Sequence, residues 1–280
     1  MALICLPSPL EPEQLKLGII VPFRDQHEEQ KRAKHLKQFY PYMEAMLCRA
    51  MAAKGGGSFH IYVIEQSQDD RKFNRGKLLN IGFDQARQDG CNSFIFHDVD
   101  LLPSEDLSSW YTTYPRWPIH IARRWDRYSA TNTDYFGGIV SFNEADYLAI
   151  NGYPNTFWGW GGEDDEMHKR TKEVGLLLVA PDVGSIEDLE QMDLNQKLSF
   201  LRSHKEWKCN VKTEALKEHS STWSSLSTFM PAKLTWPELY HSPSPGTHSC
   251  PVVFQVDVQL NSHWTDTEFN WETLERWSLV

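Results

Sequence analysis

The sequence predicts an α/β protein built on a mostly parallel sheet. Three short apolar segments rich in β-branched and aromatic residues occur within the first 100 residues, and segments with helical periodicity separate them. This alternation is typical of parallel β-α-β units, because a parallel strand pair needs a long crossover connection. An apolar fraction of 40% and a charged fraction of 24% agree with a globular domain.

In the first part of the chain, the Pro- and Glu-rich residues 1–16 predict an irregular lead-in. Strands are expected at residues 17–23, 59–65 and 91–96. Helices are expected at residues 26–53 and 74–88. The first of these helices should break or restart at Pro41 and stop at the three glycines of residues 55–57.

The second part of the chain continues the same alternation less clearly. Further strands are expected at residues 119–122, 136–142, 176–180 and 252–260, and helices at 144–151 and 163–174. Residues 155–162 are too rich in Gly and Trp to be regular, and 183–240 should be mostly helical with loops. We therefore expect a core over residues 17–182 and a C-terminal extension over 183–280 within the same domain.

Composition excludes several classes of function. Lys and Arg number 28 against 38 Asp and Glu, a net charge of -10, which disfavours nucleic acid as a partner. No apolar run reaches the ~18–20 residues that a membrane span needs. The P-loop, G-x-G-x-x-G and G-x-S-x-G motifs are absent, and none of the five cysteines forms a C-x-x-C pair. A bridge between Cys209 and Cys250, or free thiols throughout, fits the cysteine count.

Asp98 and Asp100 directly follow an apolar strand. In open α/β sheets, ligands bind beyond the carboxyl ends of the strands. Two carboxylates one residue apart can reach a single site when the strand ends in a turn. Two hard oxygen ligands there suit Mg²⁺ or Mn²⁺ holding a diphosphate. The alternative interpretation is a solvated turn.

Residues 157–166, Phe-Trp-Gly-Trp-Gly-Gly-Glu-Asp-Asp-Glu, form the most unusual segment. Its glycines allow close backbone approach, and its two Trp offer flat faces to a sugar ring. Its acids open a helix, where the helix dipole favours ionised carboxylates, and such a group at a cleft can act as a general base. The alternative is helix capping by Glu163 and Asp164, with Trp158 and Trp160 in the core.

Arginines and glycines mark other strand and helix ends. Arg24 ends the first strand and Arg75 precedes the second helix, so each could bind phosphate or a base, or lie on the surface. The glycines after Tyr135 indicate either close approach of a ligand or a bulge. The histidines do not cluster in the sequence, and His97 is expected to pack locally.

Several of these motifs occur in a fixed order: V-P-F-R at 21–24, F-N-R with K-L-L-N at 73–80, D-V-D at 98–100, Y-F-G-G at 135–138, and N-G-Y-P-N through W-G-W-G-G-E-D-D at 151–165. Together they resemble the beta-1,4-galactosyltransferase family, glycosyltransferase family 7, and most nearly its xylosylprotein branch. The resemblance implies a GT-A fold with a C-terminal elaboration, UDP-galactose as donor, a glycan or glycoside acceptor, Mn²⁺ or Mg²⁺ as cofactor, and inversion at the anomeric carbon.

The resemblance also implies roles for individual residues. Donor contacts are implied for Pro22, Phe23, Arg24, Phe73, Arg75, Asp98, Val99, Arg127, Tyr135, Trp160, Gly161 and Gly162. Acceptor contacts are implied for Tyr135, Trp160, Glu163, Asp164 and Asp165. Asp164 would be the general base with Glu163 beside it, and Asp100 would bind the metal. A tyrosine at position 135 fits galactose rather than N-acetylgalactosamine.

The chain departs from the family at the metal site. The Met-x-x-His or His-x-His motif that completes it is absent, and S-I-E-D-L-E stands at 185–190. We expect the missing ligand among Asp98, Glu187, Asp188, Glu190, His204 and His219. An all-oxygen site would favour Mg²⁺ more than a His-containing site does. Gln26 replaces a second arginine and removes one positive contact.

Other interpretations remain open on the sequence alone. The donor could be UDP-GalNAc or UDP-GlcNAc, or the chain could bind sugar nucleotides or glycans without catalysis after decay of its metal site. A nuclease or phosphatase using Asp98 and Asp100 is disfavoured by the acidic charge. Family members are usually Golgi membrane proteins and this chain shows no anchor. The expected location is therefore the Golgi lumen for a truncated member, and the cytoplasm for a soluble relative.

Overall fold

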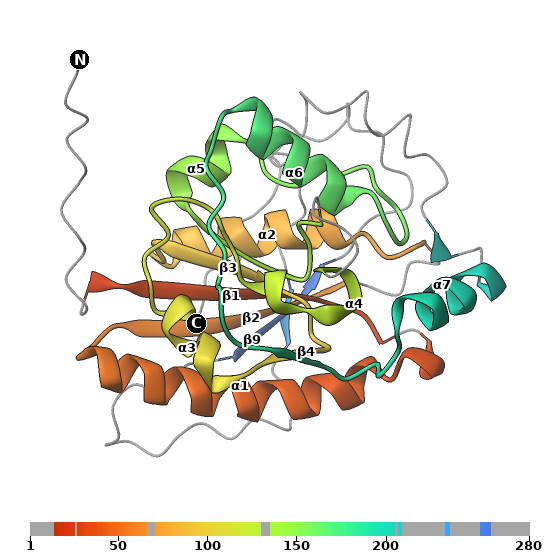
Figure 1. Cartoon of the computed structure of the whole chain (residues 1–280), viewed down its shortest axis with the longest axis horizontal. Helices are drawn as coiled ribbons and strands as arrows, with labels where there is room; N and C mark the ends of the chain where they lie inside the picture. Colours follow the sequence, from red (N-terminus) through yellow and green to blue (C-terminus); the bar gives the residue numbers. More distant parts are fainter. Residues whose placement is uncertain are drawn as a thin grey trace.

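A central sheet with helices on both faces organises the molecule (Figure 1). The computed structural model describes residues 14–25, 27–66, 71–129, 135–204 and 207–208, together with the strands at 233–235 and 253–258. Within this part of the chain, seven strands form the sheet in the order β5-β6-β3-β1-β2-β9-β8.

The centre of the sheet is parallel and its two margins are antiparallel. The parallel strands are β1 (Lys16–Phe23), β2 (Ser58–Gln66), β3 (Ser93–His97) and β9 (Val253–Val258). The antiparallel strands are β5 (Ile119–His120), β6 (Ile139–Asn143) and β8 (Lys233–Thr235). The predicted α/β class, with its parallel centre and a late C-terminal strand, is confirmed.

Helices cover the two faces unequally. The long α1 (Arg32–Lys54) lies along one face, and α2 (Arg75–Gln88), α5 (Glu144–Ala149) and α6 (Glu163–Glu173) lie over the other (Figure 1). α7 (Leu194–Ser203) lies to one side of the sheet. The shorter helices are η2 (Glu28–Gln30), η3 (Glu105–Leu107), α3 (Ser108–Tyr111), η4 (Ile121–Arg124) and α4 (Asp126–Ser129).

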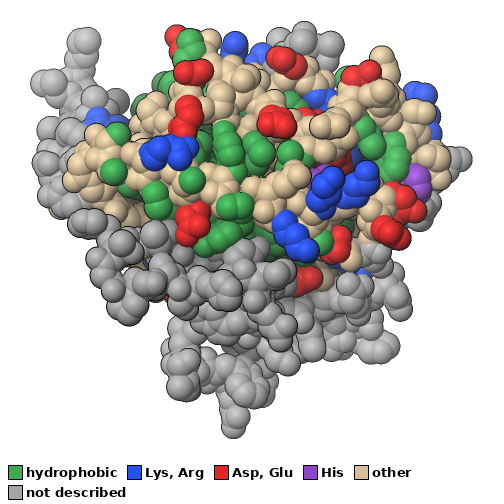
Figure 2. All heavy atoms as spheres, turned by 90° about the horizontal axis from the view of Figure 1, so that it is seen from below, with side chains coloured by type: hydrophobic (Ala, Val, Ile, Leu, Met, Phe, Trp, Pro, Cys, Tyr) green, Lys and Arg blue, Asp and Glu red, His purple; other side chains and the backbone are tan. Residues whose placement is uncertain are grey.

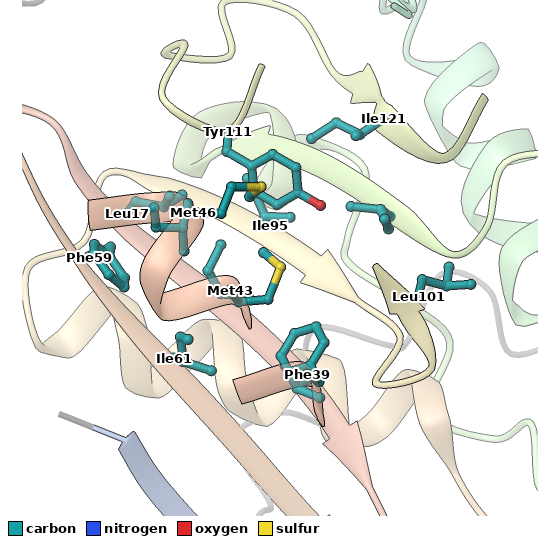
Figure 3. Packing of buried hydrophobic residues seen from close by; sticks show 14 of the residues in the cluster. Leu17, Phe39, Met43, Met46, Phe59, Ile61, Ile95, Leu101, Tyr111 and Ile121 are labelled. Carbon is teal, nitrogen blue, oxygen red and sulfur yellow. The ribbon is translucent and has the colours of Figure 1, made fainter. Parts of the chain in front are cut away.

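Strand periodicity divides the buried apolar residues into two layers. Leu17 and Ile19 of β1 point toward α1, where Phe39 and Met43 meet them, whereas Ile20 points toward α2. Figure 3 shows the α1 side of the sheet, with the side chains of α1 packed on those of the strands. Because successive strand residues face opposite sides, a strand segment buried on both faces must lack charged side chains, as residues 17–23 of β1 do.

α1 does not break at Pro41, and that expectation is wrong. The helix runs without interruption from Arg32 to Lys54 with Pro41 inside it. Pro41 is exposed, so its ring meets solvent, while Phe39, Met43, Met46 and Leu47 are fully buried on the opposite side. Burial of this apolar face outweighs the missing backbone hydrogen bond at the proline.

The predicted strand at 176–180 is also wrong. Val179 makes one isolated parallel bridge to Ile119, and Leu177 and Leu178 are exposed on the surface. The partner strand β5 has only two residues, so no longer ladder can form there. The predicted strand at 136–142 starts late, at Ile139. Gly137 packs against Asp164 in the site described below, and Gly138 has a positive φ, so neither continues the strand.

Part of the segment expected to be mostly helical is a strand. β7 (Ile186–Asp188) pairs antiparallel with β4 (Leu101–Pro103), the strand that directly follows the D-V-D motif. Asp193 then caps the N-terminus of α7, and its side chain and that of Gln196 form a reciprocal capping box. Cys48 and Cys91 are not bridged, whereas Cys209, Cys250 and most of the C-terminal extension lie outside the described residues.

Figure 2 shows acidic and basic side chains interspersed with apolar ones on one face of the molecule. Among the helices that the structure describes, none combines the length and apolar character required to cross a bilayer.

Candidate active site

A pocket of about 540 Å³ opens where β1 and β3 end. Every residue to which the resemblance gives a donor or acceptor contact lines this pocket, from Pro22 at the end of β1 to Asp165 in α6. The sequence places these residues in six separate segments. The parallel strands bring the segments together because their carboxyl ends meet at one edge of the sheet.

Arg75 joins two carboxylates at the centre of the pocket. Its Nε donates to Asp98 Oδ1 over 2.7 Å and its Nη1 donates to Asp164 Oδ1 over 2.8 Å. Burial raises the pKa of Asp164 well above its usual value, although the Arg75 guanidinium acts in the opposite direction. Burial likewise raises the pKa of Asp98 against the pull of Arg75. Arg75, for which the resemblance implies a donor contact, is thus held by Asp98 and Asp164.

Close packing against Asp164 explains why the Y-F-G-G motif has a glycine at position 137. A Cβ atom there would lie 2.3 Å from Asp164 Oδ2, so the carboxylate rests directly against the backbone. The carbonyl of Gly138 also accepts a hydrogen bond of 3.0 Å from the backbone N–H of Asp98. The motif therefore contacts the carboxylate of Asp164 and the backbone of Asp98, the two residues that Arg75 joins. Tyr135 lines the pocket beside it, stacked on Tyr128.

The Gly- and Trp-rich segment forms one wall of the pocket. The Gly159 N–H donates to the carbonyl of Phe73, and the Trp160 N–H donates to the carbonyl of Trp207. Trp158 is half-buried under the guanidinium of Arg71, whereas the Trp160 ring is 40% exposed and lines the pocket. The interpretation that places both Trp in the core fails for Trp160. Asp164 does not cap α6 either, since its N-cap is Gly162 and has no side-chain bond.

Three carboxylates gather beside this centre. Asp100, Asp188 and Glu190 each offer an oxygen, and these oxygens lie within 4.8 Å of one another. β7 brings Asp188 there by pairing it with Leu101, the residue after Asp100. Burial raises the pKa of Asp188 to about 6 despite the nearby Arg127. Burial acts in the same direction on the pKa of Asp100, but Arg32 outweighs it and holds that pKa below its usual value.

This donor set fits a divalent cation. Three carboxylate oxygens in one group are hard ligands of the kind that Mg²⁺ and Mn²⁺ accept. Of the ligands proposed from the sequence, the structure brings Asp188 and Glu190 to Asp100. Glu187 points away because it alternates with Asp188 along β7. His204 stacks on Trp207 instead, and His219 lies outside the described residues.

Cationic side chains surround the same carboxylates. Lys197 Nζ donates to both oxygens of Glu190 at 2.8 and 2.7 Å, and Arg127 pairs with Asp188 and Glu190. Arg32 pairs with Asp100 and Glu190. Sequence reasoning missed Arg32 and Lys197, because neither lies in a motif. Arg24, at the end of β1, donates from Nη1 to the carbonyl of Arg71 over 2.6 Å.

Two family models match consecutive parts of the chain. One, described as the N-terminal region of glycosyl transferase group 7, matches residues 7–113, and the other, described as the N-terminal domain of galactosyltransferase, matches residues 118–193. The chain is 41% identical over 169 residues to beta-1,4-galactosyltransferase 1 of Mus musculus and 36% identical over 170 residues to beta-1,4-galactosyltransferase 5 of Homo sapiens. These alignments cover 59% and 60% of this chain but only 39% and 40% of the relatives. The chain thus matches about two fifths of the length of these curated relatives.

A solved structure resembles this chain over most of its length. The Drosophila beta-1,4-galactosyltransferase 7, in a complex with manganese, UDP-Gal and xylobiose, superposes with a TM-score of 0.63 at 27% identity. The match covers 88% of this chain and 95% of that one. The fold is therefore the GT-A fold that the resemblance implies, as in this galactosyltransferase.

Proposed function

Because this chain belongs to glycosyltransferase family 7, the beta-1,4-galactosyltransferases, we propose that it transfers galactose from UDP-galactose to a hydroxyl of a glycan acceptor. The transfer inverts the anomeric carbon and depends on a divalent cation. A xyloside is the first acceptor to test, because the Drosophila relative was solved with xylobiose and UDP-Gal.

One observation carries this proposal. The half-buried carboxylate of Asp164, whose side chain is 25% exposed, lies in the same pocket as the carboxylates that follow β3, and the exposed ring of Trp160 lines that pocket too. A base, an acidic diphosphate-and-metal site and an apolar platform are the three parts that an inverting sugar transfer needs. With these three parts, the transfer needs no covalent nucleophile.

The protein's own groups account for the proton. In the proposed reaction, Asp164 accepts the proton of the acceptor hydroxyl while the oxygen forms its bond to C1 of galactose. The bond from C1 to the diphosphate oxygen breaks, and its electron pair leaves with UDP. The raised pKa of Asp164 suits this role, because an ionised carboxylate with a higher pKa is a stronger base. Arg75 and Gly137 hold the carboxylate in place from two sides.

The negative charge that develops as the bond to C1 breaks lies on the diphosphate of the departing UDP. Asp100, Asp188 and Glu190 would hold the divalent cation, and a cation bound there neutralises the departing diphosphate. Arg24, which lines the pocket at the end of β1, is placed to contribute further positive charge. Because the three ligands are all oxygen, we expect Mg²⁺ to support the reaction as well as Mn²⁺.

The test is release of UDP from UDP-galactose with a β-xyloside or with GlcNAc, each assayed with and without Mn²⁺. Asp164→Asn should lower kcat by about 10²- to 10⁴-fold, the usual contribution of a general base, while UDP still binds. Glu173→Gln, an exposed site on the same helix, is the control and should behave as wild type. Normal turnover by Asp164→Asn would remove Asp164 as the base.

Two alternatives give different results in the same assay. Release from UDP-GalNAc or UDP-GlcNAc in preference to UDP-galactose would change the donor. Binding of UDP-galactose without release, with every acceptor, would indicate a binding protein. A Golgi location follows from the family only as a prediction, and microscopy of the tagged protein against a Golgi marker tests it.

A further inference from the structure

Arg32 binds to the cluster of three carboxylates, Asp100, Asp188 and Glu190, that would hold a divalent cation. Its Nη1 donates to Asp100 Oδ2 over 2.5 Å and its Nη2 donates to Glu190 Oε1 over 2.6 Å. The side chains of Asp100 and Glu190 are only 10% and 6% exposed. Arg32 therefore bridges two of the three candidate ligands. Asp100 lies 68 positions and Glu190 lies 158 positions from Arg32 along the chain.

The charges of the carboxylate cluster are already balanced by cationic side chains without a metal. The three carboxylates, Asp100, Asp188 and Glu190, face the three cations Arg32, Arg127 and Lys197. A divalent cation chelated by the same oxygens would add two positive charges next to these groups. Both oxygens of Glu190 already accept hydrogen bonds from cationic side chains. A divalent cation at bonding distance from these oxygens would repel those side chains strongly, so we expect one of them to withdraw.

Arg32 is the side chain best placed to withdraw. Arg127 is 3% exposed and also donates from Nε to the carbonyl of Met192 over 2.8 Å, and Lys197 is 6% exposed. Arg32 is 18% exposed and is the first residue of α1. It lines the pocket together with Arg24 and Asp98, so a guanidinium that leaves Asp100 stays within the space proposed for the diphosphate.

We propose that Arg32 is a positioning residue that exchanges with the divalent cation, and this inference rests on the function proposed above. Without metal, Arg32 bridges Asp100 and Glu190. When the cation binds between these carboxylates, Arg32 turns to the diphosphate of the donor. The cation alone therefore binds weakly, because it must displace Arg32. Cation and diphosphate together bind more tightly, because the diphosphate receives the displaced charge.

The experiment measures the affinity of the full chain for Mn²⁺, by electron paramagnetic resonance of free Mn²⁺, with and without UDP. Arg32→Gln should bind Mn²⁺ about tenfold more tightly than wild type when UDP is absent, because the competing charge is gone. The gain in Mn²⁺ affinity on adding UDP should be smaller in Arg32→Gln than in wild type, because no side chain is displaced.

Two further variants test whether the effect comes from the bridging guanidinium of Arg32. Arg32→Lys keeps the charge but cannot bridge both carboxylates through a planar fork, so its Mn²⁺ affinity should lie between those of wild type and Arg32→Gln. Arg49→Gln removes an arginine of the same helix that pairs with Glu105 on the surface, and it should match wild type. Thermal unfolding of each variant establishes that the fold is retained.

Unchanged or weaker Mn²⁺ binding by folded Arg32→Gln would overturn the exchange, since Arg32 would then not compete with the cation. Absence of Mn²⁺ binding by every variant, with UDP present, would overturn it as well. Both outcomes are independent of transfer, which the UDP-release assay measures separately. A protein that shows the affinity shift but transfers no galactose would retain the exchange and lose the proposed reaction.

Discussion

Gly137 sets the position of the carboxylate proposed as the base. Because a Cβ atom at this position would lie 2.3 Å from Asp164 Oδ2, Gly137→Ala should push the carboxylate away from its present place. We expect kcat to fall by about 10²-fold, the effect of misplacing a reacting group by roughly 1 Å. The unfolding temperature should change little, because the displaced atoms are at the end of a side chain. Steady-state kinetics and thermal unfolding of the variant check this.

Gly82 provides the matched comparison. A Cβ atom there would lie 2.3 Å from Ile20 Cγ2, in the core between α2 and β1 and away from the pocket. Gly82→Ala should destabilise the fold by about 1–3 kcal/mol through overpacking, with kcat unchanged for the folded protein. If Gly137→Ala instead lost stability and kept its kcat, the role given to Gly137 would be wrong.

Single residues were predictable where a motif carries them. Asp98, Asp100 and Asp164 follow strands or open a helix, so their positions alone indicate one edge of the sheet. Arg32 was not predictable, because nothing near it in the sequence distinguishes it from other arginines of a charged helix. Its role arises from a contact with Glu190 across 158 positions, which only the folded chain reveals.

At the scale of the element, α1 carries a proline in its exposed middle. Pro41→Ala should restore a backbone hydrogen bond to the carbonyl of Lys37 and stabilise the protein by about 2 kcal/mol, part of the gain being offset by a freer unfolded chain. Urea unfolding of the variant measures this. Lys37→Ala, an exposed change on the same helix, should move stability by less than about 0.5 kcal/mol. Unchanged or lower stability of Pro41→Ala would mean that α1 is adapted to the proline.

Elements were predictable where their apolar pattern is long. β1, β2 and α2 match their predicted bounds to within about two residues, because each buries a continuous or periodic apolar face. The segment at 176–180 has a strand-like composition but no free edge long enough to pair with. β7 has a polar sequence, and it is a strand because β4 lies beside it. Pairing between distant segments decides both cases.

Across the whole molecule, two buried histidines should make stability depend on pH. Burial lowers the pKa of His97 and of His120 to about 4, while the unfolded chain keeps a value near 6.5. Below pH 6.5 the unfolded state binds more protons than the folded state. The free energy of unfolding should therefore fall as pH is lowered from about 6.5 to about 4, by a few kcal/mol for each histidine.

His97→Gln isolates one of these contributions. His97 is fully buried, with Nε2 beside the Tyr111 hydroxyl at 2.8 Å and Nδ1 beside the Asp98 carbonyl at 2.9 Å. The variant should be less stable at pH 7 but should lose less stability between pH 6.5 and pH 4 than wild type. Urea unfolding at a series of pH values measures both slopes. Equal slopes would show that His97 is not the group that titrates.

The parallel pairing of β2 with β9 has a consequence for synthesis on the ribosome. One edge of β2 pairs with β1, which is made earlier, but its other edge waits for β9. At about 5–20 residues per second, the roughly 190 residues between them take about 10–40 s to appear. Throughout that interval β2 presents an open row of backbone donors and acceptors, the kind of edge that other nascent chains can join. A chaperone that covers this edge should therefore raise the yield of folded protein more than one that acts after release.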